Sequence, residues 1–525
     1  MEIALCLSGG GYRAAVFHLG VMSYLNKVNM PHGGRLLDRV HTITCISGGA
    51  LPGLSYLLAM ARNEDIDTAF KQLYRLLVNN GLSNPLLQDF DVKSGEKMGL
   101  IESLAYVYDD IFFHQARFGE ILDYVSWDGI HHFSVDATDF ELGMPFRFQA
   151  TDKIENPNRE EEHGVIGNKQ HRIDWGIAHE IRIADIMAAT SCFPLVFEPI
   201  SYPNDFTFRN PDIRRSQDAS YVLMDGGLVD NQGIDPALHA EYHLSQKGRN
   251  HDLLILSDAG NMNSEEENKP VKLTRVSPDC IFWIIYALMA LLGIGAIVLL
   301  HTKILWAFGI CLSLFAVSVA LLCLIRTVER KVMRYISDKG NISYNYNFIW
   351  KHTINNILEF IRTRLNTTQR MVNVIMMGQI KKSSYQVLFN STQWKNRIML
   401  NSLSILSTKG RWNRVLQKRN EEDKRLKPSR AIRQNSDKAN QMKTTLWFSD
   451  EEIRTRMPEA ILACGQYTVC WNLLQQIDRL KATPEDLLTD GQKELIGIEG
   501  ILRGDWVRFC RNPKYMTNSF REDRL

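Results

Sequence analysis

The sequence predicts an α/β protein that carries a hairpin of two long apolar helices and a mainly helical C-terminal region. Three observations indicate this architecture. Short apolar strands in the N-terminal half are followed by glycine-rich turns and apolar-faced helices, as at 41–62. Two long uncharged runs occupy 280–300 and 304–325. Beyond them, apolar residues recur at helical spacing, as at 354–365.

The predicted organisation has three parts. The α/β domain is expected at 1–262, the apolar hairpin at 279–326 and the helical region at 340–525. Two arrangements stay open for the helical region, because its elements could stand apart or could partly complete the α/β domain.

Ser47 lies between a predicted strand and a predicted helix, which is the setting of a nucleophile elbow. The run at 41–46 is β-branched and apolar, Gly48 and Gly49 break it, and a helix is expected from Gly53. Gly49 fits the closing glycine of G-x-S-x-G, whereas Cys45 replaces the opening one. An ordinary strand-to-helix turn with a capping serine is the alternative.

A glycine-rich loop, Gly9-Gly10-Gly11-Tyr12-Arg13-Ala14, joins a strand at 3–7 to a helix at 14–28. It formally satisfies the dinucleotide-binding pattern G-x-G-x-x-G/A, which also requires an acidic residue at the end of the next strand. The next strand ends at Ser47 without a carboxylate. We therefore interpret the N–H groups of Gly9, Gly10 and Gly11 as an oxyanion hole. Arg13 would add positive charge or hold the loop in place.

Asp225 ends a short apolar strand at 221–224 and precedes Gly226 and Gly227. A carboxylate at the carboxyl end of a strand lies where α/β proteins place their sites, although Asp-Gly is also a common turn. None of the 14 histidines lies, as Ser47 and Asp225 do, between an apolar strand and a glycine-rich turn. The simplest hypothesis is a Ser47–Asp225 dyad, in which the carboxylate accepts the serine proton and later activates water.

Together these motifs resemble those of the patatin-like phospholipases over roughly residues 1–260. That family carries a G-G-G-x-R-G loop, a G-x-S-x-G serine and a D-G-G/A aspartate in this order. Ala189-Thr190-Ser191-Cys192-Phe193-Pro194 and Asp136-Ala137-Thr138-Asp139 resemble lesser family motifs. The resemblance implies a three-layer α/β/α fold, the Ser47–Asp225 dyad and hydrolysis of fatty-acyl esters. Cys45 and Ala14 depart from the family's glycines, which puts rate and loop geometry in question.

No cofactor, metal or nucleic acid is expected. No group of residues has metal-ligand spacing, and the 9 cysteines are scattered as in a reduced protein. The net charge of +2 argues against nucleic-acid binding as the main role.

The uncharged runs at 280–300 and 304–325 predict two transmembrane helices, and His301-Thr302-Lys303 between them makes an antiparallel hairpin. Two buried core helices are the alternative, but such helices rarely run so far without a charge. Basic residues flank both ends of the hairpin: Lys269, Lys272, Arg275, Arg326, Arg330, Lys331 and Arg334. The positive-inside rule then predicts an integral membrane protein with its catalytic domain on the cytoplasmic side. Small residues in the runs would allow helix packing within the hairpin or between protomers, so a homo-oligomer stays open.

The sequence therefore predicts a membrane-anchored serine lipid acyl hydrolase that acts on membrane lipids, of the phospholipase A or lysophospholipase type. Two alternatives stay open. The chain could be a catalytically silent, lipid-binding membrane scaffold, or an acyltransferase that uses the same acyl-enzyme with an alcohol acceptor.

Overall fold

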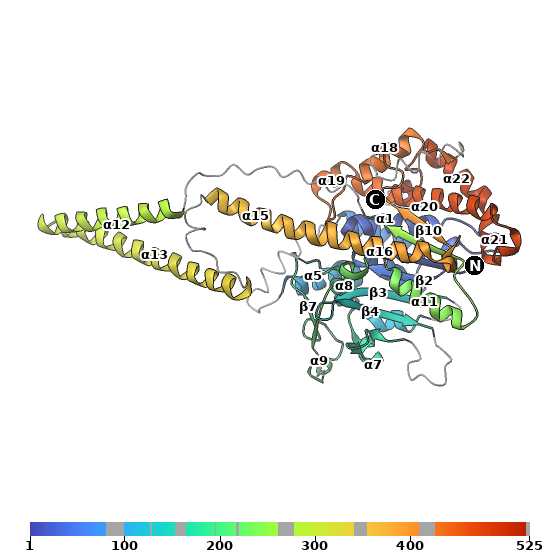
Figure 1. The fold of residues 1–525 in the computed structure, drawn as a ribbon, viewed down its shortest axis with the longest axis horizontal. Coiled ribbons are helices and arrows are strands. Elements are labelled where there is room, and N and C mark those ends of the chain that lie inside the picture. The colour runs from blue at the N-terminus through green and yellow to red at the C-terminus, as the bar shows by residue number, and fades with distance from the viewer. Residues whose placement is uncertain are drawn as a thin grey trace. The chain divides into compact units, whose positions relative to one another are not determined.

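The chain divides into two compact units, of which the first joins 1–264 to 372–525 and the second spans 265–371 (Figure 1). The computed structural model describes residues 1–79, 99–125, 129–152, 164–194, 196–216, 220–260, 278–340, 354–408 and 426–520. Each unit is described by itself.

A 10-stranded mixed sheet forms the centre of the first unit. Eight strands follow the order β10-β9-β1-β2-β3-β4-β5-β6, and the other two lie off this path, where β8 pairs with β3 and β7 pairs with β8. The parallel strands are β1 (Ile3–Leu7), β2 (Val40–Ile46), β3 (His132–Asp139), β9 (Leu253–Asp258) and β10 (Ile398–Ser402). The antiparallel strands are β4 (Met144–Thr151), β5 (Ile166–Gly167), β6 (Arg172–Ile173), β7 (Ile200–Tyr202) and β8 (Tyr221–Asp225). The predicted α/β fold is confirmed, with a mixed sheet at its centre.

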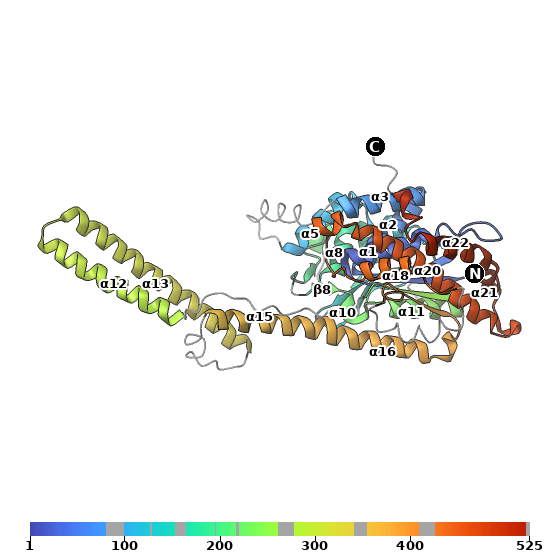
Figure 2. The same cartoon turned by 90° about the horizontal axis from the view of Figure 1, so that it is seen from above.

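Helices cover both faces of this sheet, and the side chains of β1 show why. Ile3, Leu5 and Leu7 join the larger core on one face, whereas Ala4 and Cys6 join a smaller core on the other. A strand buried on both faces is typical of a parallel sheet. The larger core includes α1 (Gly11–Leu25), α2 (Ala50–Ala61) and α20 (Met457–Lys481), and the smaller core includes α11 (Ile234–Gln246) and α16 (Met377–Asn390) (Figure 2).

The C-terminal region contributes a strand and a central helix to this unit. β10 pairs in parallel with β9 at the edge of the sheet. α20 packs along α1, where a Cβ on Gly20 would overlap Leu462 O and one on Gly465 would overlap Phe17 O. The two helix backbones therefore approach more closely than any residue other than glycine would allow.

The second unit contains two helices, α12 (Pro278–His301) and α13 (Leu305–Gly340), which pack side by side (Figures 1 and 2). Lys303, with φ of +56°, lies in the turn between them. Near the opposite end, the Arg326 guanidinium lies 4.6 Å from the centroid of the Phe282 ring, so the pair is antiparallel.

By length and composition, both helices could cross a membrane. Phe282–His301 has a mean hydropathy of 2.5 and Leu305–Thr327 one of 2.7, and 0% and 6% of these stretches are buried. A core helix of a soluble protein would bury most of such a surface. Among the predicted basic flanks, Lys269, Lys272 and Arg275 lie outside the described residues.

The remaining helices of the first unit are mostly short. They are α3 (Ile66–Asn79), α5 (Leu100–Tyr108), α6 (Phe118–Leu122), α7 (Trp175–Glu180), α8 (Ile183–Ser191), α9 (Asp212–Ser216), α10 (Gly227–Asp230), α18 (Arg430–Ala439), α19 (Asp450–Arg454), α21 (Asp490–Gly497) and α22 (Glu499–Arg511). The second unit also contains α15 (Ile354–Arg370).

Candidate active site

Two strands that run towards each other bring Ser47 and Asp225 together. β2 is parallel to β3 and pairs with it as far as Ile46 opposite Asp136. β8 is antiparallel to β3. Its last residue, Asp225, lies opposite Ala137, which follows Asp136 on β3. The carboxyl ends of β2 and β8 therefore meet at adjacent positions of one strand. The sequence placed each residue at a strand end but did not reveal this opposed arrangement.

Ser47 occupies the turn between β2 and α2 with φ of +49°, a region that residues other than glycine seldom adopt. Its N–H donates to Thr190 Oγ1 at 2.9 Å, and the Thr190 hydroxyl donates to the Asp136 carbonyl at 2.6 Å. This pair of hydrogen bonds fixes the strained turn to α8 and β3, as a nucleophile elbow requires. Thr190 and Asp136 both lie in the lesser family motifs, but the sequence did not indicate this role.

The Ser47 hydroxyl donates to Asp225 Oδ2 at 2.8 Å, which is the contact that a dyad needs. The other carboxylate oxygen, Oδ1, accepts the Gly227 N–H at 2.7 Å, and Thr138 Oγ1 donates to the Asp225 carbonyl at 2.8 Å. Both side chains are buried, with Ser47 7% and Asp225 4% exposed.

Burial makes the Asp225 carboxyl group a weaker acid. Desolvation raises the pKa of Asp225 from 3.8 to about 6, and the hydrogen bonds from Gly227 and Ser47 oppose that rise. At neutral pH the group is therefore ionised yet more basic than an exposed aspartate, as suits a general base.

The predicted turn glycines lie where neighbouring backbone or side chains leave no room for a Cβ. A Cβ on Gly48 would overlap Gly11 O, and one on Gly49 would overlap Leu7 O. Equivalent overlaps would occur between Gly226 and Asp136 O, and between Gly227 and Asn231 Oδ1. These four glycines thus allow the turn at Ser47, the glycine loop and the turn at Asp225 to pack against one another.

Fewer backbone N–H groups of the glycine loop are available to bind an oxyanion than the sequence predicted. The Gly9 N–H donates to the Asn231 carbonyl at 3.0 Å, and the Tyr12 N–H donates to Thr445 O at 2.8 Å. For Gly10 and Gly11, the part of the chain that the structure describes supplies no acceptor for the backbone N–H. Their φ values of +142° and +60° belong to conformations that favour glycine. Gly10 and Gly11 are therefore the candidate oxyanion donors, and Gly9 holds the loop.

Arg13 takes the second of its two predicted roles, which is to hold the loop in place. Its guanidinium is buried, 4% exposed, and donates to the Met442 carbonyl at 2.8 Å. Burial lowers the pKa of Arg13 to about 10, so the group remains a cation at neutral pH. The C-terminal segment that contains Met442 and Thr445 is thereby bound to the glycine loop. No signal in the sequence identified these carbonyl partners.

His18 supports the same loop from inside α1. Its Nε2 donates to the Ser8 carbonyl at 2.9 Å, so its neutral Nδ1 accepts from Ser257 Oγ at 2.8 Å. Burial lowers the pKa of His18 to about 4, which keeps the ring neutral. Among the described residues, no histidine is recorded in a hydrogen bond or ion pair with Ser47 or Asp225.

A cavity of about 550 Å³ opens beside the amino end of β10, away from the dyad. Its lining includes Lys395, Arg397 and Thr489 but no pair of nucleophile and base. The candidate chemistry therefore belongs to Ser47 and Asp225 rather than to this cavity.

Comparison with known proteins identifies the domain that carries these residues. Residues 5–238 match the family described as patatin-like phospholipase. The match spans the residues that carry the candidate site, and the predicted resemblance to the patatin-like phospholipases is confirmed. No curated protein matches the chain.

Three solved structures resemble the chain distantly. Human GIVD cytosolic phospholipase A2 is 11% identical with a TM-score of 0.31, and the match covers 49% of this chain and 42% of that chain. The same human enzyme in complex with methyl gamma-linolenyl fluorophosphonate is 12% identical with a TM-score of 0.23, over 28% of this chain and 22% of that one. VipD from Legionella pneumophila is 10% identical with a TM-score of 0.23, over 99% and 85% of the two chains. These likenesses carry no argument about function.

Proposed function

We propose that the chain is a membrane-anchored serine lipid acyl hydrolase of the phospholipase A or lysophospholipase type. One observation carries the proposal. The Ser47 hydroxyl donates to a buried carboxylate at 2.8 Å, on an elbow that packs against the glycine loop of a patatin-like phospholipase domain.

In the proposed reaction, Ser47 Oγ attacks the ester carbonyl while Asp225 accepts the hydroxyl proton. The oxyanion of the tetrahedral intermediate receives hydrogen bonds from the N–H groups of Gly10 and Gly11. As the intermediate collapses, the C–O bond to the alcohol breaks, and Asp225 returns the proton to that leaving oxygen. Water, deprotonated by Asp225, then attacks the acyl-enzyme, releases the fatty acid and restores the serine.

Helices α12 and α13 would hold this domain at its substrate. Their length, apolar composition and exposure support a membrane hairpin. A tether of this kind raises the effective concentration of enzyme at the bilayer without any new contact. The basic residues on both sides of the two runs support a cytoplasmic position for the catalytic domain.

The test is mass spectrometry of lipids after the detergent-purified full chain is incubated with mixed phospholipid vesicles. We expect free fatty acid and lysophospholipid from the wild type and from Ser55→Ala, a control for loss of a hydroxyl on α2. Ser47→Ala should release neither while it retains the melting temperature of the wild type. Hydrolysis that persists in Ser47→Ala would refute the proposal. New acyl esters in place of free fatty acid would instead indicate acyl transfer.

A further inference from the structure

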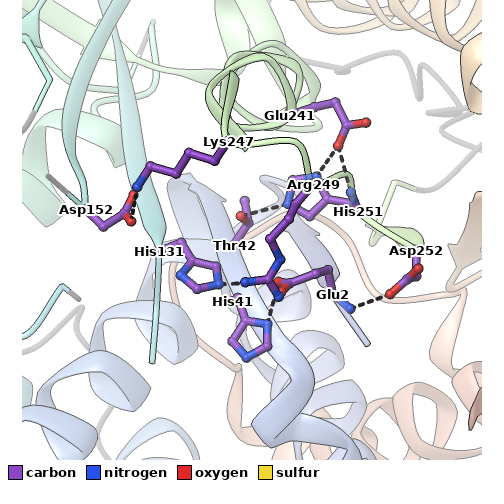
Figure 3. A network of polar contacts seen from close by, with 10 residues as sticks. All are labelled: Glu2, His41, Thr42, His131, Asp152, Glu241, Lys247, Arg249, His251 and Asp252. Atoms are coloured by element: carbon purple, nitrogen blue, oxygen red, sulfur yellow. Dashed lines mark hydrogen bonds and ion pairs between the residues drawn. The ribbon is translucent and has the colours of Figure 1, made fainter. Parts of the chain in front are cut away.

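Three potential metal ligands meet at the amino side of the sheet, where the parallel strands begin. Glu2 directly precedes β1, His41 is the second residue of β2 and His131 directly precedes β3. The strand register brings them together, because Ile3 pairs with Val40 and Thr42 pairs with His132. Figure 3 shows the two imidazoles next to each other, both facing the Glu2 carboxylate.

The distances within this group are short. Glu2 Oε2 lies 2.7 Å from His41 Nδ1 and 3.3 Å from His131 Nε2, and one ligand atom from each residue lies within 4.8 Å of the other two. The two imidazole centroids are 4.7 Å apart. Glu2 and His131 are buried, and the His41 side chain is 18% exposed. The group therefore has one side from which an ion and a water molecule could enter.

We propose that Glu2, His41 and His131 form a binding site for a divalent transition-metal ion, for which Zn²⁺ is the best fit. Zinc takes imidazole nitrogen and carboxylate oxygen at about 2.0–2.1 Å in a tetrahedral arrangement. Neighbouring ligand atoms then lie about 3.3 Å apart. The separation between Glu2 Oε2 and His131 Nε2 already has this value, and the separation of 2.7 Å between Glu2 Oε2 and His41 Nδ1 would need to lengthen to reach it. Water would occupy the fourth position.

The Glu2 carboxylate is held so that one oxygen faces the imidazoles. Arg249 forms an ion pair with Oε1, which leaves Oε2 on the side of His41 and His131 (Figure 3). The Glu2 N–H donates to Asp252 Oδ2 at 2.7 Å, so the backbone is fixed as well. Partners that orient a ligand in this way are a regular feature of metal sites.

An ordinary hydrogen-bonded ion pair accounts less well for this geometry. Glu2 Oε2 and His41 Nδ1 approach to 2.7 Å, yet among the described residues neither atom is recorded in an aligned hydrogen bond. Buried polar atoms of this kind usually have a partner. A metal ion bound between them would satisfy both lone pairs.

The role of this site would be structural. His41 lies near the start of β2 and Ser47 follows its last residue, so the six positions from one to the other separate them by about 20 Å. An ion there would join the first residues of β1, β2 and β3 rather than touch the ester. The inference is thus independent of the proposed hydrolase activity, and it departs from the sequence expectation of no metal.

The experiment is zinc binding to the untagged full chain in detergent, after treatment with a chelator and dialysis against Zn²⁺. Elemental analysis should find one equivalent of tightly bound zinc in the wild type and in His32→Gln, a control at an exposed histidine. His41→Gln and His131→Gln should each lose it. Cobalt substitution should give the strong visible absorption of a tetrahedral site in the first two proteins alone.

A measurement on the wild type keeps the test decisive if a variant does not fold. X-ray absorption at the zinc edge should detect two imidazole ligands, with oxygen atoms as the other ligands. A wild type that retains no zinc would overturn the proposal. So would folded His41→Gln and His131→Gln variants that keep as much zinc as His32→Gln.

Discussion

The two sides of the central sheet differ in how their polar groups are held, and β2 reaches both. At its carboxyl end, Ser47 has a strained backbone and lies next to the glycine loop, where a Cβ on Gly9 would be 3.3 Å from Ser47 Cβ. At its amino end, charged groups are paired, since His251 Nδ1 lies 2.6 Å from Glu241 and Lys247 Nζ lies 2.5 Å from Asp152 (Figure 3). The end where chemistry is proposed therefore has a strained turn and two backbone N–H groups, of Gly10 and Gly11, for which the described residues supply no acceptor. At the opposite end these two ion pairs are satisfied, in contrast to the buried atoms of Glu2 and His41.

The largest effect on activity should come from removal of the base at the carboxyl side. Asp225→Asn keeps an oxygen that can accept the Gly227 N–H but loses the group that accepts the Ser47 proton. We expect kcat to fall by about 10²–10⁴-fold, the usual contribution of general base catalysis. Single-turnover kinetics with a chromogenic fatty-acyl ester would measure this loss. A variant with wild-type kcat would show that another group is the base.

The same carboxylate predicts opposite pH trends for activity and stability. Because its pKa is raised from 3.8 to about 6, the folded state binds more protons than the unfolded state between these values. Its contribution to stability therefore decreases as pH rises through that window, while kcat/KM increases as the base ionises near pH 6. Asp225→Asn should be at least as stable as the wild type at pH 7. Thermal unfolding and kcat/KM across pH 4–8 would test both trends, and a pH-independent kcat/KM would contradict them.

A smaller loss is expected from the oxyanion loop. A Cβ on Gly11 would overlap the Thr445 carbonyl, and φ of +60° adds backbone strain. Gly11→Ala should displace the loop and lower kcat by about 10²-fold, the usual effect of a lost oxyanion donor. Gly33→Ala is the matched control, since Gly33 also has positive φ but no neighbour within 4 Å. Equal kcat in the two variants would argue against Gly11 as a donor.

The sequence predicted those parts of the candidate site that lie between an apolar strand and a glycine-rich turn. Ser47, Asp225 and the glycine loop each lie between an apolar strand and a run of small residues, so a single segment identifies them. Thr190, Asn231 and Met442 act through contacts across 143, 222 and 429 positions of sequence, respectively, and Asn231 and Met442 do so with backbone carbonyls. Any residue type offers such a carbonyl, so no pattern of letters indicates the contact.

The same reasoning explains what was missed in the fold. β10, a five-residue strand, joins the edge of the sheet far from its partners in sequence, although the segment around it was expected to be mainly helical. The group formed by Glu2, His41 and His131 gathers ligands from three separate strand beginnings rather than from one short motif. Metal-ligand spacing within a segment could not have predicted it.

Cys45, which departs from the family's glycine, packs against Gly53, and this packing can be tested. A Cβ on Gly53 would overlap Cys45 Sγ, whereas its other neighbours lie 3.6 Å away. Gly53→Ala alone should therefore destabilise the protein by about 1–3 kcal/mol through overpacking. The double variant Cys45→Gly/Gly53→Ala should recover most of that loss, with a coupling of more than about 1 kcal/mol in thermal or denaturant unfolding. Additive effects would contradict the proposed packing of the two positions.

The smallest effect on turnover should come from the amino side. Removal of bound metal with a chelator should leave kcat within about twofold of the untreated enzyme, because the ion would lie about 20 Å from Ser47. It should nevertheless lower the melting temperature by several degrees, since an ion that binds the folded state alone stabilises that state. Ser47→Ala should show the same shift in melting temperature, which separates stability from turnover. The chelator could instead lower kcat at temperatures far below unfolding, with zinc restoring it. That result would contradict a purely structural role for the metal site.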